Sequence, residues 1–159
     1  MNIFMLHQEP QIAAQYHCDK HVIKMVLESA QLLCTALNTV HGKQVMPYKS
    51  THINHPCAIW VRESRDNALW LVELTAALNA EYKYRYGKTH KVYSSGLAAA
   101  LESVPNNMSS NVWTIPPSAM AKEYIVSDDP VTNYRNYYIN GKKHLHKWSK
   151  RSIPNWMQL

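Results

Sequence analysis

The feature of this sequence best suited to catalysis is a single glutamate that is surrounded by lysines and histidines. Glu28 lies four residues after Lys24, seven after His21 and eight after Lys20. On an α-helix, which turns by about 100° per residue, these positions share one face. A carboxylate flanked by cations stays ionised at neutral pH, so it can stabilise a developing positive charge or act as a base. The same face carries further polar residues, namely His17, Gln31, Thr35 and Asn38.

The helix that must position Glu28 is predicted from about Pro10 to Val40, with a bend near His17–Lys20. Its other positions are apolar, so it is expected to be the central helix of the domain. A polar stripe on an amphipathic helix is commonly just its wet side, and that interpretation stays open. We favour the interpretation that the stripe forms the floor of a cleft. It carries one carboxylate with two lysines and two histidines, whereas a surface stripe normally mixes several Glu with Lys.

Other helices are predicted from their start and stop signals. Asn54-His55-Pro56 opens a second long helix that ends near Gly87, and a short helix is expected at Ser95–Glu102. The stretch Val104–Ala119 is too long for a simple connection, which favours a functional loop. Asp129-Pro130 opens a last helix. Trp60, Trp70, Leu71 and Leu74 are expected in the core, and Tyr124–Val126 and Ile3–Leu6 are weak strand candidates.

Length and composition define the fold class. The 159 residues are 46% hydrophobic and 18% charged, with four glycines and no internal repeat. We therefore predict an all-α, compact single-domain bundle over residues 1–159, built around the long N-terminal helix and carrying long loops. The three cysteines are an odd number, which is typical of a reducing compartment. The sequence has no apolar run long enough for a membrane helix, so a cytoplasmic protein without a membrane partner is expected.

Positive charge is concentrated toward the carboxyl end. The net charge is +6, and none of the eleven acids follows Asp129. The basic, aromatic segment 130–159 is therefore expected to attract polyanions, DNA in particular. On the second helix, His55 and Arg62 are two turns apart and suit phosphate contact, although Arg62 and Arg65 could equally pair with neighbouring acids. The predicted nucleic-acid contacts are Lys20, His55, Arg62, Arg65, Lys142, Lys143, Lys147, Trp148, Lys150 and Arg151.

Asp19-Lys20-His21, followed by Glu28 seven residues after the histidine, resembles the motif of a known family. The sequence is similar here to the phage pyrimidine-dimer DNA glycosylases with lyase activity, the endonuclease V family. Those small helical proteins carry Asp-x-His near the start of their first long helix, and their catalytic Glu follows at this spacing. Ile115-Pro116, leading to Glu123-Tyr124-Ile125, is a further similarity. The resemblance implies Glu28 as the catalytic carboxylate and His21 as a residue that contacts substrate.

The family's nucleophile is the α-amine exposed when Met is removed before a small second residue. An α-amine, with a pKa near 8, is more often unprotonated at pH 7 than lysine. It can attack the sugar C1′ and form a Schiff base while a carboxylate stabilises the positive charge. Here the second residue is Asn2, before which Met is not usually removed. The candidates are therefore the Met1 amine, Lys24, or a water activated by Glu28.

Two other function classes stay open. The chain could bind nucleic acid without catalysis, or it could be a zinc-dependent enzyme of nucleic acids. His17-Cys18-x-x-His21 and His52-x-x-His55-x-Cys57 invite the zinc interpretation, although no Cys-x-x-Cys or His-Glu-x-x-His motif occurs. Because Cys34 and Cys57 are expected to be buried small hydrophobes, we predict an enzyme without a metal or other cofactor. Double-stranded DNA is its expected partner, and a damaged or modified base its expected substrate.

Overall fold

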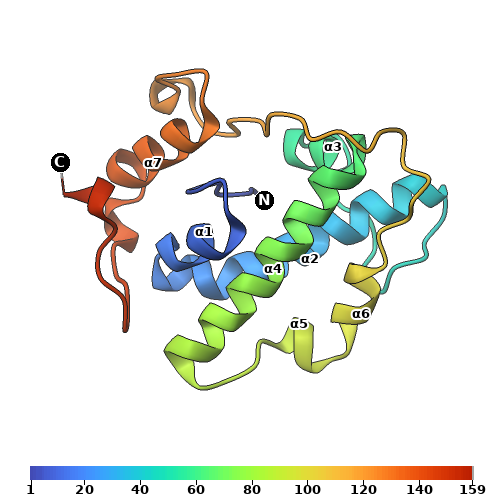
Figure 1. The fold of residues 1–159 in the computed structure, drawn as a ribbon, viewed down its shortest axis with the longest axis horizontal. Coiled ribbons are helices and arrows are strands. Elements are labelled where there is room, and N and C mark those ends of the chain that lie inside the picture. Colours follow the sequence, from blue (N-terminus) through green and yellow to red (C-terminus); the bar gives the residue numbers. More distant parts are fainter. Residues whose placement is uncertain (159) are drawn as a thin grey trace.

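The computed structural model describes residues 1–158, and within them every regular element is a helix (Figure 1). The all-α prediction is therefore confirmed, and the weak strand candidates Ile3–Leu6 and Tyr124–Val126 are wrong. None of the described helices is long and apolar enough to cross a membrane. The elements are α1 (Pro10–Tyr16), α2 (Asp19–His41), α3 (Pro56–Glu63), α4 (Arg65–Tyr86), α5 (Lys91–Ser94), α6 (Leu97–Glu102) and α7 (Pro130–Gly141), with short 3-10 turns at Lys122–Tyr124, Lys143–Leu145 and Asn155–Met157.

The long first helix is divided at the expected bend. His17 and Cys18 have extended backbones, with ψ values of 133° and 160°. Their surroundings explain the break, because distant groups satisfy the backbone there. The Asp19 N–H donates to the Lys147 carbonyl at 2.8 Å, and the His17 carbonyl accepts a bond from Arg85 at 2.9 Å. These long-range bonds end α1 and let α2 start in a new direction.

The second long helix is also two helices, which corrects the prediction of a continuous one. Ser64 separates α3 from α4 with φ −146° and ψ 156°, and its Oγ accepts the Asn67 N–H at 3.1 Å. A serine side chain that bonds the backbone in this way caps a helix start. The short helix predicted at Ser95–Glu102 begins two residues later, at Leu97. The last helix begins at Pro130 as predicted, capped by the Asp129 carboxylate.

Helix α2 is the centre of the packing, since it contacts α3, α4, α5 and α6. Most of its apolar positions join one hydrophobic cluster that includes the predicted core residues Trp60, Trp70, Leu71 and Leu74, whereas Ile23 and Leu27 are exposed. The three cysteines are buried and unpaired. The amino-terminal segment, residues 3–6, is buried as well, and Figure 1 shows the chain start in the middle of the molecule, between α7 and the α3–α4 pair.

The carboxyl-terminal half of the α2 polar stripe is structural. Asn38 Oδ1 accepts the N–H groups of Val45 and Met46, both at 2.8 Å. Thr35 Oγ1 accepts the Thr51 N–H at 3.1 Å. Both side chains are buried under the connection between α2 and α3. Only the amino-terminal half of the stripe, around Lys20, Lys24 and Glu28, is left for other roles.

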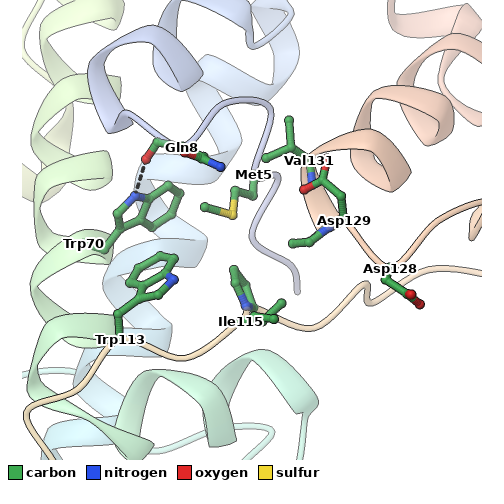
Figure 2. Close-up of a pocket in the computed structure, with 10 residues that line it drawn as sticks. Met5, Gln8, Trp70, Trp113, Ile115, Asp128, Asp129 and Val131 are labelled. Atoms are coloured by element: carbon green, nitrogen blue, oxygen red, sulfur yellow. Dashed lines mark hydrogen bonds between the residues drawn. The ribbon is translucent and has the colours of Figure 1, made fainter.

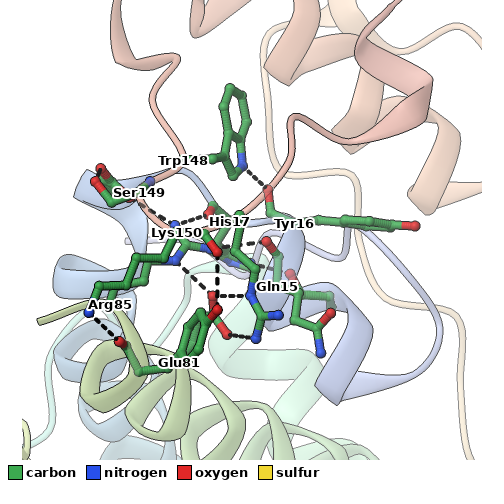
Figure 3. Close-up of polar contacts among 12 residues, drawn as sticks. Gln15, Tyr16, His17, Glu81, Arg85, Trp148, Ser149 and Lys150 are labelled. Carbon is green, nitrogen blue, oxygen red and sulfur yellow. Dashed lines mark hydrogen bonds and ion pairs between the residues drawn. The ribbon is translucent and has the colours of Figure 1, made fainter. Parts of the chain in front are cut away.

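A polar network fastens the carboxyl-terminal segment to the helices (Figure 3). The fully buried Arg85 bonds Glu81 at 2.7 Å and Asp19 at 3.0 Å. From the carboxyl-terminal segment, Ser149 bonds both oxygens of Asp19, and Arg151 forms a two-point ion pair with Glu81. Burial alone would raise the pKa of Asp19, but the bonds from Ser149 and Arg85 outweigh it and lower that pKa. Asp19, the aspartate of the Asp-x-His motif, is thus part of a structural network.

Candidate active site at Glu28 and the chain start

Glu28 lies directly against the start of the chain. Its Oε2 accepts the backbone N–H of Asn2 at 3.1 Å and lies 3.9 Å from the α-amine of Met1. Its Oε1 pairs with Lys24 Nζ at 3.1 Å. The Glu28 side chain is 13% exposed, whereas that of Lys24 is 67% exposed, so the site opens to solvent on the Lys24 side. Two amines and one carboxylate therefore meet at one position, where the Met1 side chain is 5% exposed and only Lys24 reaches far into solvent.

The side chain of Asn2 ties this chain start to three other parts of the fold. Its Nδ2 donates to the Ala119 carbonyl at 2.8 Å, and its Oδ1 accepts the Tyr134 hydroxyl at 2.8 Å. The Cys57 thiol also lies 3.6 Å from Oδ1. We call these four residues the Asn2 cluster. It joins the chain start to α3, to the long loop after α6 and to α7.

His55 flanks the same site in a defined tautomer. Its Nδ1 accepts the Cys57 N–H at 3.1 Å and so caps α3. With Nδ1 acting as the acceptor, the neutral ring carries its proton on Nε2. Burial lowers the pKa of His55, the positive charges of the chain start and His52 lower it further, and the charge of Glu28 opposes them. His55 is therefore a neutral hydrogen-bond donor near Glu28.

His21 is placed differently from the prediction. It is buried, stacks on Phe4 with ring centroids 4.3 Å apart, and bonds the Tyr138 hydroxyl through Nδ1. Burial and, to a smaller extent, the positive charges of His17, Lys142 and Lys24 together lower its pKa to about 3. A ring enclosed in this way packs the chain start onto α2. The prediction that His21 touches substrate does not fit this placement.

Two predicted nucleic-acid contacts in the carboxyl-terminal segment have partners within the protein. Trp148 is 8% exposed and its Nε1 donates to the Tyr16 carbonyl, so its ring is not free to stack on a base. Arg151 is held by both oxygens of Glu81 and lies over the Tyr84 ring at 4.3 Å. Both residues fasten the segment to the body of the molecule. Local sequence could not show this, because their partners are distant in the chain.

The remaining predicted nucleic-acid contacts differ in how exposed their side chains are. Lys20, Lys143 and Lys147 are exposed. Lys142 lies over the Tyr137 ring at 4.7 Å. The positive charges of Lys142 and Lys24 both contribute to the lowered pKa of His21. The other three are partly engaged: Arg62 bonds the Ile53 carbonyl, Arg65 is half-buried, and Lys150 Nζ lies 3.3 Å from the Tyr84 carbonyl.

The histidine and cysteine clusters do not converge. No group of three or more His, Cys, Asp or Glu side chains within residues 1–158 is arranged to hold a metal ion. His17 bonds the Ala13 carbonyl, and His55 is used as a helix cap. The structure thus places these side chains in separate local roles.

A cavity of about 670 Å³ lies outside the Glu28 site. Figure 2 shows Trp70 and Trp113 on one side of it and Val131 and Asp129 on the other, with Met5 between them. Its lining carries the charges of Asp128 and Asp129 and no lysine or arginine. Such a surface repels phosphodiesters, which favours the Lys24 side of the molecule for a nucleic acid.

Comparisons with protein-family models, with curated protein sequences and with solved structures each gave no match. Membership of the glycosylase family therefore stays a prediction from the Asp19–Glu28 spacing. The residues that sequence reasoning missed are Asn2, Tyr134 and His52. Asn2 interrupts an otherwise apolar start, Met1–Leu6, and an isolated amide there was the one signal that could have found it.

Proposed function

We propose that this chain is a DNA N-glycosylase that removes a damaged or modified base, with a lyase step started by the amine at the chain start. The supporting observation is the 3.9 Å approach of the Met1 amine to the Glu28 carboxylate across 27 positions of sequence. Double-stranded DNA in the cytoplasm is the proposed substrate. The resemblance to the pyrimidine-dimer glycosylases at Asp19–Glu28 points to the same chemistry.

The chemistry follows from the two groups. The neutral Met1 amine attacks C1′ of the nucleotide, and the base leaves with the electron pair of the glycosidic bond. Loss of a proton from nitrogen and opening of the sugar ring give an imine between the amine and C1′. Positive charge develops at C1′ and nitrogen during these steps, and the ionised Glu28 stabilises it. The Nε2–H of His55 can donate a hydrogen bond to a sugar or phosphate oxygen.

The surroundings of Glu28 favour a polyanion. Lys24 and Lys20 are exposed on α2, and Lys142 with His144 brings positive charge from the carboxyl-terminal segment to the same end of α2. The neutral His55 lies near Glu28 and the chain start, and His52 is near His55. The positive charges of the lysines attract a sugar-phosphate backbone toward the position where Glu28 lies. A base in a duplex must be flipped out or the duplex locally distorted for C1′ to reach this position.

A borohydride trapping experiment tests the proposal. Abasic duplex DNA is mixed with the protein and reduced, and a covalent adduct is expected because the imine becomes a stable secondary amine. Glu28→Gln should keep its affinity for DNA but lose at least about 100-fold in the rate of adduct formation, since a group that stabilises the transition state is gone. Glu73→Gln, an exposed glutamate on α4, is the matched control and should retain the full rate.

The other outcomes of these assays would each point to a different function or site. Duplexes that carry a panel of modified bases detect base release when no imine is formed, which would assign the attack to a water activated by Glu28. Binding that weakens steeply with salt, without adduct or base release, would replace the enzyme by a non-catalytic DNA-binding protein. Full activity of Glu28→Gln would show that the site lies elsewhere.

A further inference from the structure

The side chain of Asn2 is satisfied by contacts from four directions. Besides the bonds to Ala119 and Tyr134, Oδ1 accepts the N–H of Ile3 at 2.8 Å and has the Cys57 thiol at 3.6 Å. The backbone N–H of the same residue donates to Glu28. The backbone N–H, the side-chain nitrogen and the side-chain oxygen of Asn2 thus each have a partner within the protein.

The partners of Asn2 are themselves fixed. Tyr134 is 1% exposed, its hydroxyl lies 2.9 Å from the Pro117 carbonyl, and it accepts the Ala119 N–H at 3.3 Å. Cys57 is fully buried in the first turn of α3, and burial raises the pKa of its thiol to about 11, so it stays neutral. A buried, fully bonded polar group specifies a single arrangement, because any other leaves a partner unsatisfied.

This arrangement determines which amine can serve Glu28. With Asn2 held, the Met1 amine lies 3.9 Å from the carboxylate, and the Met1 side chain, 5% exposed, packs against the hydrophobic core. Removal of Met1 would make the Asn2 nitrogen the terminal amine, 3.1 Å from Glu28 Oε2. With or without Met1, the Asn2 cluster therefore keeps a terminal amine close to the carboxylate. Lys24, in contrast, is a long and 67% exposed side chain whose reactive geometry is not fixed.

We propose that Asn2 is a positioning residue that holds the chain-start amine beside Glu28, and that this amine rather than Lys24 is the nucleophile. This inference rests on the glycosylase-lyase function proposed above. A nucleophile that is held in the reactive geometry does not lose conformational freedom during the reaction. A displacement of about 1 Å can lower the rate on the order of 100-fold. The Asn2 cluster supplies that placement from residues outside the Glu28–Lys24 pair.

Two substitutions test the positioning role. Tyr134→Phe removes the hydroxyl that donates to Asn2 Oδ1, and Asn2→Asp keeps the shape but removes the donor to Ala119. Aspartate at position 2 is as large as asparagine, so Met1 is not usually removed before it. Tyr138→Phe is the matched control, because Tyr138 is one turn further on α7, equally buried and hydrogen-bonded to His21 instead.

Three measurements are made on each protein. Intact mass shows whether Met1 is retained. The pH dependence of acylation at the α-amine, followed by peptide mapping, reports the reactivity and accessibility of that amine without any DNA. The rate of borohydride-trapped adduct formation at saturating abasic DNA reports the chemical step, and mapping of the adduct identifies the nitrogen.

The expected results separate positioning from folding. Tyr134→Phe and Asn2→Asp should keep their helical circular dichroism and their DNA affinity, lose about 10- to 100-fold in adduct rate, and show faster acylation of the freed α-amine. Tyr138→Phe should match the unmodified protein in adduct rate. In the unmodified protein the adduct should map to the chain-start amine.

Contrary results are equally clear. An adduct on Lys24, or unchanged adduct rates in both variants, would overturn the inference. If no protein forms an adduct, the proposed lyase function fails. The acylation data then still decide the positioning role, which is overturned when acylation is the same in Tyr134→Phe, Asn2→Asp and Tyr138→Phe.

Discussion

Arg85 shows how a single residue can connect distant parts of the fold. Its guanidinium reaches Glu81 one turn earlier on α4, Asp19 at the start of α2, and the carbonyls of Gln15 and His17. A planar group with five donors suits this task, and lysine could not replace it. Since Arg85 is buried with two carboxylates, their charges are acceptable only while it is present.

Arg85→Met is therefore expected to lower the free energy of unfolding by about 3–5 kcal/mol, because it leaves Asp19 and Glu81 without their buried partner. Chemical denaturation at neutral pH measures this loss. Lys83→Met, an exposed position two residues earlier on the same helix, should change it by less than about 0.5 kcal/mol. Equal effects of the two substitutions would show that the buried network contributes no special stability.

At the residue scale, the sequence indicated Glu28 and its ion pair with Lys24, because the two are four positions apart on one helix. It did not indicate Asn2 or Tyr134, whose contact joins positions 132 residues apart. Local patterns carry no information on such pairs. For the same reason Arg151 and Trp148 were assigned to DNA, although Glu81 and the Tyr16 carbonyl occupy their polar groups.

At the scale of elements, the helix starts and stops were predicted well where a local group causes them. Asp129 caps α7, and Gly87, with φ +68°, ends α4. The two interruptions have different causes. At Ser64 the serine cap was a readable signal, whereas at His17 and Cys18 the break depends on bonds to Arg85 and Lys147. Tertiary contacts override helix propensity at that junction.

The junction between α1 and α2 buries two neutral histidines, which makes stability depend on pH. Burial lowers the pKa of His17 to about 4 and that of His21 to about 3, against 6.5 for the unperturbed ring. Between these values the unfolded chain binds more protons than the folded one, so stability decreases as pH falls below about 6.5. The slope approaches about 1.4 kcal/mol per pH unit for each histidine.

Denaturation by urea from about pH 7.5 to about pH 4.5 measures this slope. The lowered pKa values of His55 and His90 act in the same direction. His21→Gln is expected to flatten the profile, whereas His7→Gln, outside the junction, should leave its slope unchanged. A profile that is flat in the unmodified protein would mean that the buried rings are protonated in the folded state.

At the scale of the whole molecule, charge is divided between the faces. Asp128 and Asp129 line the cavity beside Trp113, while Lys24 and Lys142 lie near His21, toward the amino-terminal end of α2. Composition alone predicted a polyanion partner but could not separate free cations from paired ones. The structure leaves Lys143 and Lys147 exposed and pairs Arg151 with Glu81.

This division predicts which cations contribute to DNA binding. Lys143→Ala combined with Lys147→Ala should reduce the dependence of log K on log salt by about 0.9 for each phosphate that is no longer neutralised. Arg151→Gln should leave that dependence unchanged and instead lower the melting temperature, since it breaks the bonds to Glu81. Fluorescence anisotropy titrations at several salt concentrations give the slopes. Equal slopes for the double variant and the unmodified protein would place the DNA on another surface.

The long loop between α6 and α7 carries a tryptophan, Trp113, whose fluorescence can report on the position of the loop. Trp113 in this loop packs edge-on against Trp60, with centroids 5.4 Å apart, and also contacts Trp70. Six residues further along the loop, the Ala119 carbonyl holds the Asn2 amide. A movement of the loop that releases the chain start would also separate the indole rings. Intrinsic tryptophan emission can therefore follow the opening of the Glu28 site in unlabelled protein.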